Sequence, residues 1–183
     1  MLKESTYETL GNRGTDAQSP CRRHLRTTAA SKAGVFGEYR AHHDRPRANT
    51  ITDEELLEGS GSLGPFTLRK LRTDETIPQS FGKCGDGAGP NLRIVNGGGV
   101  FRFQDGSLLT VTIIGGALCI DLDHLLGHLT ETCQITGGTG RFEGAKGNLA
   151  LTATLKVVLF NASNAAVLLT STGNFEGTVS GVQ

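Results

Sequence analysis

The 183-residue sequence has no net charge, no long apolar run and only 5% aromatic residues. Its 18 basic residues balance 18 acidic ones, so no overall field attracts nucleic acid or an anionic membrane surface. No apolar stretch approaches the roughly 20 residues that a membrane-spanning helix needs. We therefore expect neither nucleic acid nor a membrane span among the interactions of this chain.

A secretory signal is also missing from the chain as it begins here. Residues 1–10 carry charges and contain no apolar stretch of about 7–15 residues. Localisation stays open at this point, with export included if the true start lies elsewhere. The four cysteines, at positions 21, 84, 119 and 133, suit either a reducing or an oxidising compartment.

Composition divides the chain into two parts. Residues 1–60 hold 18 of the 36 charged residues and 5 of the 26 glycines, whereas residues 61–183 hold 21 glycines. We expect a disordered tail and linker over 1–60, because this polar sequence buries little apolar surface, and a β-domain over 61–183. A nucleic-acid- or membrane-binding arm is the alternative for the basic stretch 19–50. Thr52 and Glu55 have capping-box spacing, which predicts one or two helical turns.

Beyond the first sixty residues, apolar and polar residues alternate with the period of β-strands. Segment 101–111 predicts a hairpin with a three-residue turn over 105–107 and Gly106 at positive φ. That register pairs Phe101 with Val111 and gathers the large apolar side chains on one face. Further strands are expected near 91–96, 117–122, 129–136 and 148–159, with two short ones around Gly173. Seven or eight antiparallel strands favour a closed barrel or sandwich.

The glycine-rich segment 133–155 does not fit a nucleotide cradle. Glu143 stands where a dinucleotide fingerprint needs its third glycine, and Ala145 precedes Lys146 where a Walker loop needs glycine. The residues that follow alternate as a strand, so no helix begins at the loop. We expect no cofactor and no metal here. The segment is interpreted as a β-corner formed by Gly137, Gly138, Gly140, Phe142, Gly144 and Gly147.

The stretch ITGGTGRFEGAKGNLAL, residues 135–151, resembles a segment of the allene oxide cyclase barrel family and, more loosely, of the related dirigent proteins. The preceding hairpin, FRFQDGSLLTV, is similar to the strand pair before that segment in the cyclases. A group of uncharacterised bacterial proteins resembles both stretches more closely. The resemblance implies an eight-stranded antiparallel barrel, often a homotrimer, with an apolar cavity open at one end.

The resemblance argues against the cyclase reaction itself. The first barrel strand of the cyclases supplies a Glu and an Asn that hold a water and the substrate, and the matching strand here, PFTLRKL, has Thr67 and Arg69. The barrel-lining cysteine of the family has no counterpart. We expect Thr67, Arg69, Phe101 and Phe103 to contact a ligand. An inward Arg69 would need an anion from the wall or from that ligand, whereas an outward Arg69 would be an ordinary surface residue, and the alternation of the strand does not decide between the two.

Cys119, His124, His128 and Cys133 are spaced almost symmetrically about Leu126. A hairpin that turns there puts Cys119 opposite Cys133, as a disulfide in an exported protein or as two thiols otherwise. A zinc site is the third alternative, although the histidines would then lie roughly 16 Å along a strand from the cysteines.

Charged residues near these positions are compatible with a catalytic role or with a purely structural role. Asp121, Asp123 and Glu131 could supply paired carboxylates for acid–base work, or a solvated rim. Arg141 and Glu143 flank Phe142 and are expected to pair across the barrel mouth.

Three functions are compatible with these sequence features. The leading hypothesis is a barrel that binds a small apolar ligand without the cyclase reaction. The second is an isomerase, cyclase or dirigent-type enzyme acting on a hydrophobic intermediate, and the third is a structural or oligomeric module. Inward polar side chains that converge would favour catalysis, an aliphatic lumen would favour binding, and a solid lumen would favour the third.

Overall fold

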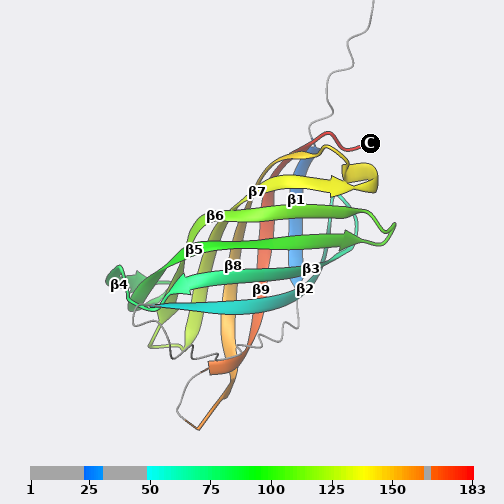
Figure 1. Cartoon of the computed structure of the whole chain (residues 1–183). Coiled ribbons are helices and arrows are strands. Elements are labelled where there is room, and N and C mark those ends of the chain that lie inside the picture. Colours follow the sequence, from blue (N-terminus) through cyan, green and yellow to red (C-terminus); the bar gives the residue numbers. More distant parts are fainter. Residues whose placement is uncertain (1–22, 31–48, 163–165) are drawn as a thin grey trace, which may run out of the picture.

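The computed structural model describes residues 23–30, 49–162 and 166–183, which form an antiparallel barrel (Figure 1). One 3₁₀ turn, η1 (Gly140–Phe142), interrupts the strands. The strands are β1 (Arg23–Ala30), β2 (Thr50–Gly61), β3 (Phe66–Glu75), β4 (Ser80–Cys84), β5 (Gly87–Phe103), β6 (Leu108–Asp121), β7 (Leu126–Thr139), β8 (Lys146–Phe160) and β9 (Ala166–Ser180).

Pairing between β3 and β5 closes the sheet into a ring. The strand order is β3-β2-β1-β9-β8-β7-β6-β5-β4 with an added β3–β5 pairing, so β5 has three neighbours, β4 has one and each of the other strands has two. β4 pairs only with β5 and projects at one end (Figure 1). The predicted antiparallel barrel is confirmed, and closure leaves few unpaired strand edges.

The barrel begins before residue 61, which corrects the predicted domain boundary. β2 pairs with β3 in continuous register from Thr50↔Glu75 to Gly59↔Phe66, and β1 pairs with β9. Thr52 and Glu55, predicted to begin one or two helical turns, lie in β2 instead, and the alternate side chains Glu55 and Leu57 are buried in the lumen. The rest of the predicted tail, 1–22 and 31–48, lies outside the described residues.

The β5–β6 hairpin has the predicted loop length and the predicted glycine conformation. Gly106 has φ +81°, and the Phe103 amide donates to the Ser107 carbonyl, so the three loop residues are 104–106 rather than 105–107. Phe101 consequently faces Leu109, two positions from the predicted partner. A shift of two residues keeps the period, so the large apolar side chains still share the inner face.

β9 runs unbroken through Gly173, where two short strands were predicted. A Cβ atom on Gly173 would lie 2.4 Å from the Thr152 carbonyl oxygen and 2.6 Å from the Ala153 Cβ atom of β8. The glycine therefore allows close approach of two paired strands and does not mark a turn.

The predicted corner after β7 closes one end of the barrel. Gly140 and Gly144 have φ +61° and +72°, conformations that favour glycine. They carry the chain through η1, which buries Phe142, directly into β8 without any longer helix. Arg141 stacks on Phe103 and Phe142 and pairs with Asp105, which corrects the predicted pair with Glu143. We call this end the closed end.

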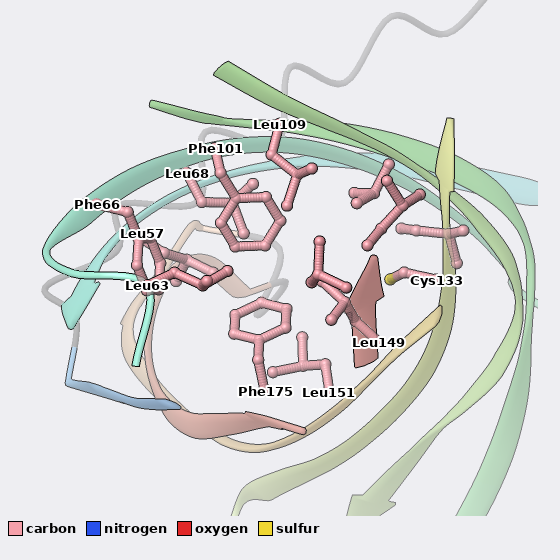
Figure 2. Close-up of a cluster of buried hydrophobic side chains, with 14 of the residues drawn as sticks. Leu57, Leu63, Phe66, Leu68, Phe101, Leu109, Cys133, Leu149, Leu151 and Phe175 are labelled. Atoms are coloured by element: carbon pink, nitrogen blue, oxygen red, sulfur yellow. The ribbon is translucent and has the colours of Figure 1, made fainter. Parts of the chain in front are cut away.

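The half of the lumen next to the closed end is packed solid with aromatic and aliphatic side chains (Figure 2). The Phe101 ring lies 5.2 Å from that of Phe66 and 5.3 Å from that of Phe175, both edge-to-face. Figure 2 shows the leucines of the surrounding strands converging on these rings. The space left beside Phe175 measures only about 10 Å³. Each of these side chains contributes about 2–3 kcal/mol through burial.

Candidate binding site at the open end

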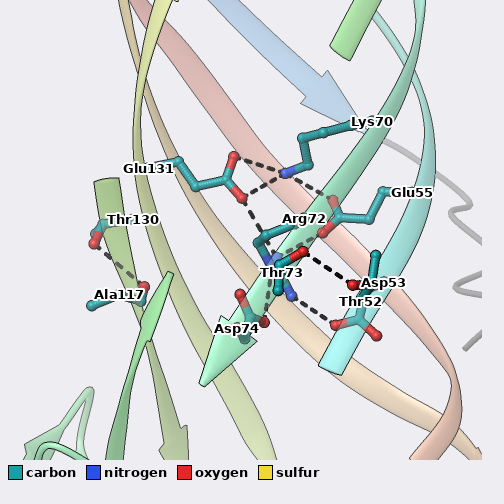
Figure 3. Close-up of polar contacts among 10 residues, drawn as sticks. All are labelled: Thr52, Asp53, Glu55, Lys70, Arg72, Thr73, Asp74, Ala117, Thr130 and Glu131. Carbon is teal, nitrogen blue, oxygen red and sulfur yellow. Dashed lines mark hydrogen bonds and ion pairs between the residues drawn. The ribbon is translucent and has the colours of Figure 1, made fainter. Parts of the chain in front are cut away.

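The inner face of β3 changes character along its length. Phe66 and Leu68 point into the solid half, and the next inward residues are Lys70, Arg72 and Asp74, each at most 2% exposed. Because side chains of a strand alternate between faces, the continuing period fixes these three charged groups inside the barrel. They meet carboxylates from β2 and β7, and Figure 3 shows the resulting cluster.

Lys70 lies at the centre of the barrel between two glutamates. Its Nζ atom donates to both carboxylate oxygens of Glu131 at 2.8 Å and lies 3.2 Å from Glu55 Oε2. Glu55 and Glu131 are 1% and 2% exposed, so the three charges are held almost without water. A buried charge is tolerated only with such partners. The cluster forms a layer next to the solid half, which we call the charged layer.

Arg72 lies next along the strand and is surrounded by carboxylates. Its Nη1 atom donates to Glu55 at 2.7 Å, its Nε atom to Asp74 at 2.9 Å and its Nη2 atom to Asp53 at 3.3 Å. Burial lowers the pKa of Arg72, but the neighbouring carboxylates outweigh burial and raise that pKa above its ordinary value. Arg72 therefore stays charged and holds the cluster together.

Asp74 is the least satisfied member of the cluster. Its Oδ2 atom accepts from Arg72, while its buried Oδ1 atom has no hydrogen-bond partner. Loss of water raises the pKa of Asp74 to about 6, although Arg72 opposes the shift. Burial also raises the pKa of Asp53, again against Arg72. Two carboxyl groups on this layer thus resist ionisation.

A cavity of about 410 Å³ lies beyond the charged layer, at the end of the barrel opposite η1. Asp53, Arg72 and Asp74 contribute its polar surface. The remaining walls are apolar apart from backbone: Ile51, Leu92, Leu118, Ile120, Leu122, Leu125, Leu126, Gly127, Leu155, Val157, Phe160, Ala166 and Leu169. We call this end, formed by the β6–β7 turn and the ends of β8 and β9, the open end.

The predicted ligand contacts lie elsewhere. Thr67 and Arg69 are on the outer face of β3, where Arg69 is paired with Glu54 and its side chain is 74% exposed. The strand period places the neighbouring Lys70 inward instead, so Thr67 and Arg69 do not line the open-end cavity. Phe101 and Phe103 do point inward, but they belong to the solid half and do not line the open-end cavity.

The disulfide of the described chain joins Cys84 of β4 to Cys119 of β6. The predicted partner, Cys133, is a buried free thiol in the solid half, and burial raises its pKa to about 12. The reason is register: the β6–β7 turn spans residues 122–125 and sets Cys119 opposite His128. His128 has a buried Nε2 atom without a hydrogen-bond partner.

Of the three carboxylates predicted to cluster, Asp121 and Asp123 lie together beside Gly87 and Ala88, and Glu131 lies apart from them. Asp121 receives backbone hydrogen bonds in the β6–β7 turn and pairs with exposed His124 at 2.9 Å, which raises the pKa of His124. Exposed Asp123 accepts from the Ala88 amide, whereas Glu131 belongs to the central cluster. Among the described residues, no three His, Cys, Asp or Glu side chains are arranged to hold a metal ion. No helix in the same residues is long and apolar enough to traverse a bilayer.

Comparisons with known proteins give one structural likeness. No protein-family model matches the sequence, and no curated protein matches it significantly. A solved structure of a pterocarpan synthase dirigent protein is similar with a TM-score of 0.39 and 15% sequence identity, over 88% of this chain and 85% of that chain.

Proposed function

We propose that this barrel binds a small apolar molecule in its open-end cavity. The observation that supports the proposal is the cavity itself, about 410 Å³ with leucine, isoleucine and valine walls above a charged layer. Pockets for small molecules commonly measure about 300–1,000 Å³ and combine apolar walls with a few polar groups. Filling such a pocket removes apolar surface from water and is favourable for that reason.

The opening of the cavity has the same apolar character. Leu122 and Leu125 on the β6–β7 turn are 56% and 58% exposed, and Phe160 at the end of β8 is 42% exposed. These three side chains line the cavity as well. A ligand of low water solubility would meet apolar surface from the entrance inward.

Binding of 2-ethylnaphthalene, a neutral apolar probe, tests the proposal directly. The intrinsic fluorescence of the probe would be followed during titration with the wild-type protein and with Val157→Trp. Val157 lines the cavity, so an indole there fills part of it and should reduce affinity at least tenfold. Val158→Trp is the matched control, because the adjacent side chain points outward and is 55% exposed.

The result of this titration distinguishes an apolar-ligand binder from a structural or oligomeric module. Saturable binding that Val157→Trp abolishes and Val158→Trp retains would support the apolar binder. Equal binding to both variants would locate the probe elsewhere and contradict the proposal. Absence of binding would leave the structural or oligomeric module as the function to pursue.

A second candidate is an isomerase, cyclase or dirigent-type enzyme, and Asp74 is the observation in its favour. A carboxyl group with a pKa near 6 beside an apolar cavity is suited to give and take protons. The other inward charged groups converge within hydrogen-bond reach, which also favours catalysis, but Lys70 and Arg72 are already held by carboxylates, so binding stays the leading proposal.

Native mass spectrometry of protein purified from its host would decide between the two. A compound that co-purifies and keeps its mass when added back supports binding. A compound converted by wild-type protein but not by Asp74→Asn supports the enzyme.

A further inference from the structure

The floor of the open-end cavity carries more carboxyl groups than cations. The described part of the cluster contains Lys70 and Arg72 against four carboxyl groups, those of Asp53, Glu55, Asp74 and Glu131. With every group ionised, two negative charges are left uncompensated. In a setting of low dielectric, that excess favours any positive charge that reaches it.

The cations of the cluster are already turned toward carboxylates. Lys70 is bound by Glu131 and Glu55 and does not line the cavity. Arg72 directs Nε, Nη1 and Nη2 at three separate acidic side chains. The polar surface left for a ligand is therefore mainly that of acceptors.

Asp74 offers the most specific of these acceptors. It lines the cavity, its side chain is 1% exposed, and its Oδ1 atom has no hydrogen-bond partner. A buried acceptor without a partner costs free energy until a donor meets it. Asp53 lines the same cavity and can share that donor, since its only hydrogen bond in the cluster is the 3.3 Å contact from Arg72.

We propose that the ligand is a hydrophobic amine, bound with its ammonium group against Asp74 and Asp53 and its apolar body along the leucine walls. The inference rests on the proposed apolar-ligand function and specifies the polar end of that ligand. An ammonium group has three donors and no acceptor, which complements this floor. Its hydrogen bonds to a carboxylate are roughly twice as strong as neutral ones.

Four probes with one naphthalene body would separate the possibilities by calorimetry at pH 7. They are 2-(2-naphthyl)ethylamine, 2-(2-naphthyl)ethanol, 2-ethylnaphthalene and 2-naphthylacetate. The amine is protonated at this pH, because alkylammonium groups titrate near the lysine value of about 10.4. We expect it to bind at least about tenfold more tightly than 2-ethylnaphthalene, with the alcohol between them and the acetate weakest.

Asp74→Asn tests the assigned acceptor. The asparagine oxygen can still accept from Arg72 Nε, while its amide group would present a donor where Oδ1 now lies. We expect the preference for the amine over 2-ethylnaphthalene to disappear. Glu54→Gln is the matched control, because this carboxylate on the outer face of β2 pairs with Arg69, and the preference should be unchanged.

The wild-type series alone can overturn the inference, even if the variant folds poorly. Equal affinity for the amine and 2-ethylnaphthalene would refute the amine and leave the apolar binder standing. Tighter binding of the acetate would also refute it. If none of the four probes binds, the proposed function itself fails.

Discussion

The two halves of the lumen share one wall and differ in what fills them. Toward the closed end, interlocking phenyl rings and leucines leave a space of about 10 Å³. Toward the open end, the same strands enclose a charged layer and a cavity of about 410 Å³. The boundary falls within β3, between Leu68 and Lys70. One half therefore stabilises the barrel by apolar packing, and the other contains the charged cluster and the open-end cavity.

The largest expected effect comes from breaking the charged layer. Lys70→Met would leave Glu131 buried, with Arg72 Nη1 3.6 Å away as its remaining cation. Removing one partner of a buried ion pair typically costs about 3–5 kcal/mol. We expect the double variant Lys70→Met/Glu131→Leu to recover most of this loss in urea unfolding. Equal stability of Lys70→Met and wild type would mean that the layer is hydrated, not buried.

A leucine-to-alanine substitution in each half of the lumen compares how tightly the two halves are packed. Leu149→Ala in the solid half should lower the free energy of unfolding by about 2–5 kcal/mol, because a closed cavity remains. Leu126→Ala should cost about 1 kcal/mol or less, because Leu126 already borders an open cavity. Chemical denaturation of both variants measures the difference. Similar losses at the two positions would contradict the division of the lumen.

The pH dependence of stability reports on Asp74. Its pKa is about 6 in the folded protein and 3.8 as the ordinary value, so between these pH values the folded state binds the proton more tightly. The resulting stabilisation is complete below pH 3.8 and is lost as pH rises through 6, an amount of about 3 kcal/mol. Between pH 4 and pH 7, wild type should lose about 2 kcal/mol more than Asp74→Asn in urea titrations. Parallel profiles would show that Asp74 is solvated.

The smallest expected effect is the alkylation of Cys133 in the folded protein. Cys133 lies in the solid half, and its thiol has a pKa raised to about 12, so little thiolate exists at pH 8. A Cys21→Ser variant kept in its oxidised form should take up almost no iodoacetamide until denaturant is added, as measured by mass spectrometry. Rapid alkylation of Cys133 in the folded state would indicate that the solid half opens.

The local patterns of the sequence predict the barrel wall well. Period-two alternation predicts most strands, and the alternation that follows the glycine-rich segment identifies that segment as a corner between strands. Closure was harder to foresee, since β2 has the composition of a solvated segment and Glu55 is buried only because Lys70 and Arg72 on the paired strand β3 supply cations. The trimer expected from family resemblance stays a prediction.

The open-end site was missed for a related reason. Lys70 stands in phase with Phe66 and Leu68, which is the signal that could have placed it inside. A lysine at that position is ordinarily read as exposed, and its partner Glu131 lies 61 residues away on β7. The disulfide likewise depends on the position of the β6–β7 turn. A turn at 122–125 sets Cys119 opposite His128 and not opposite Cys133, and Cys119 forms its disulfide with Cys84.

Methyl NMR of a leucine-labelled sample can show whether an apolar probe enters the open-end half of the lumen alone. On titration with 2-ethylnaphthalene, we expect chemical-shift changes for Leu118, Leu155 and Leu169, which line the open-end cavity. We expect none for Leu57, Leu109 and Leu149 in the solid half. Shifts confined to the second set, or spread evenly over both, would contradict the division between a solid half and a ligand-binding half.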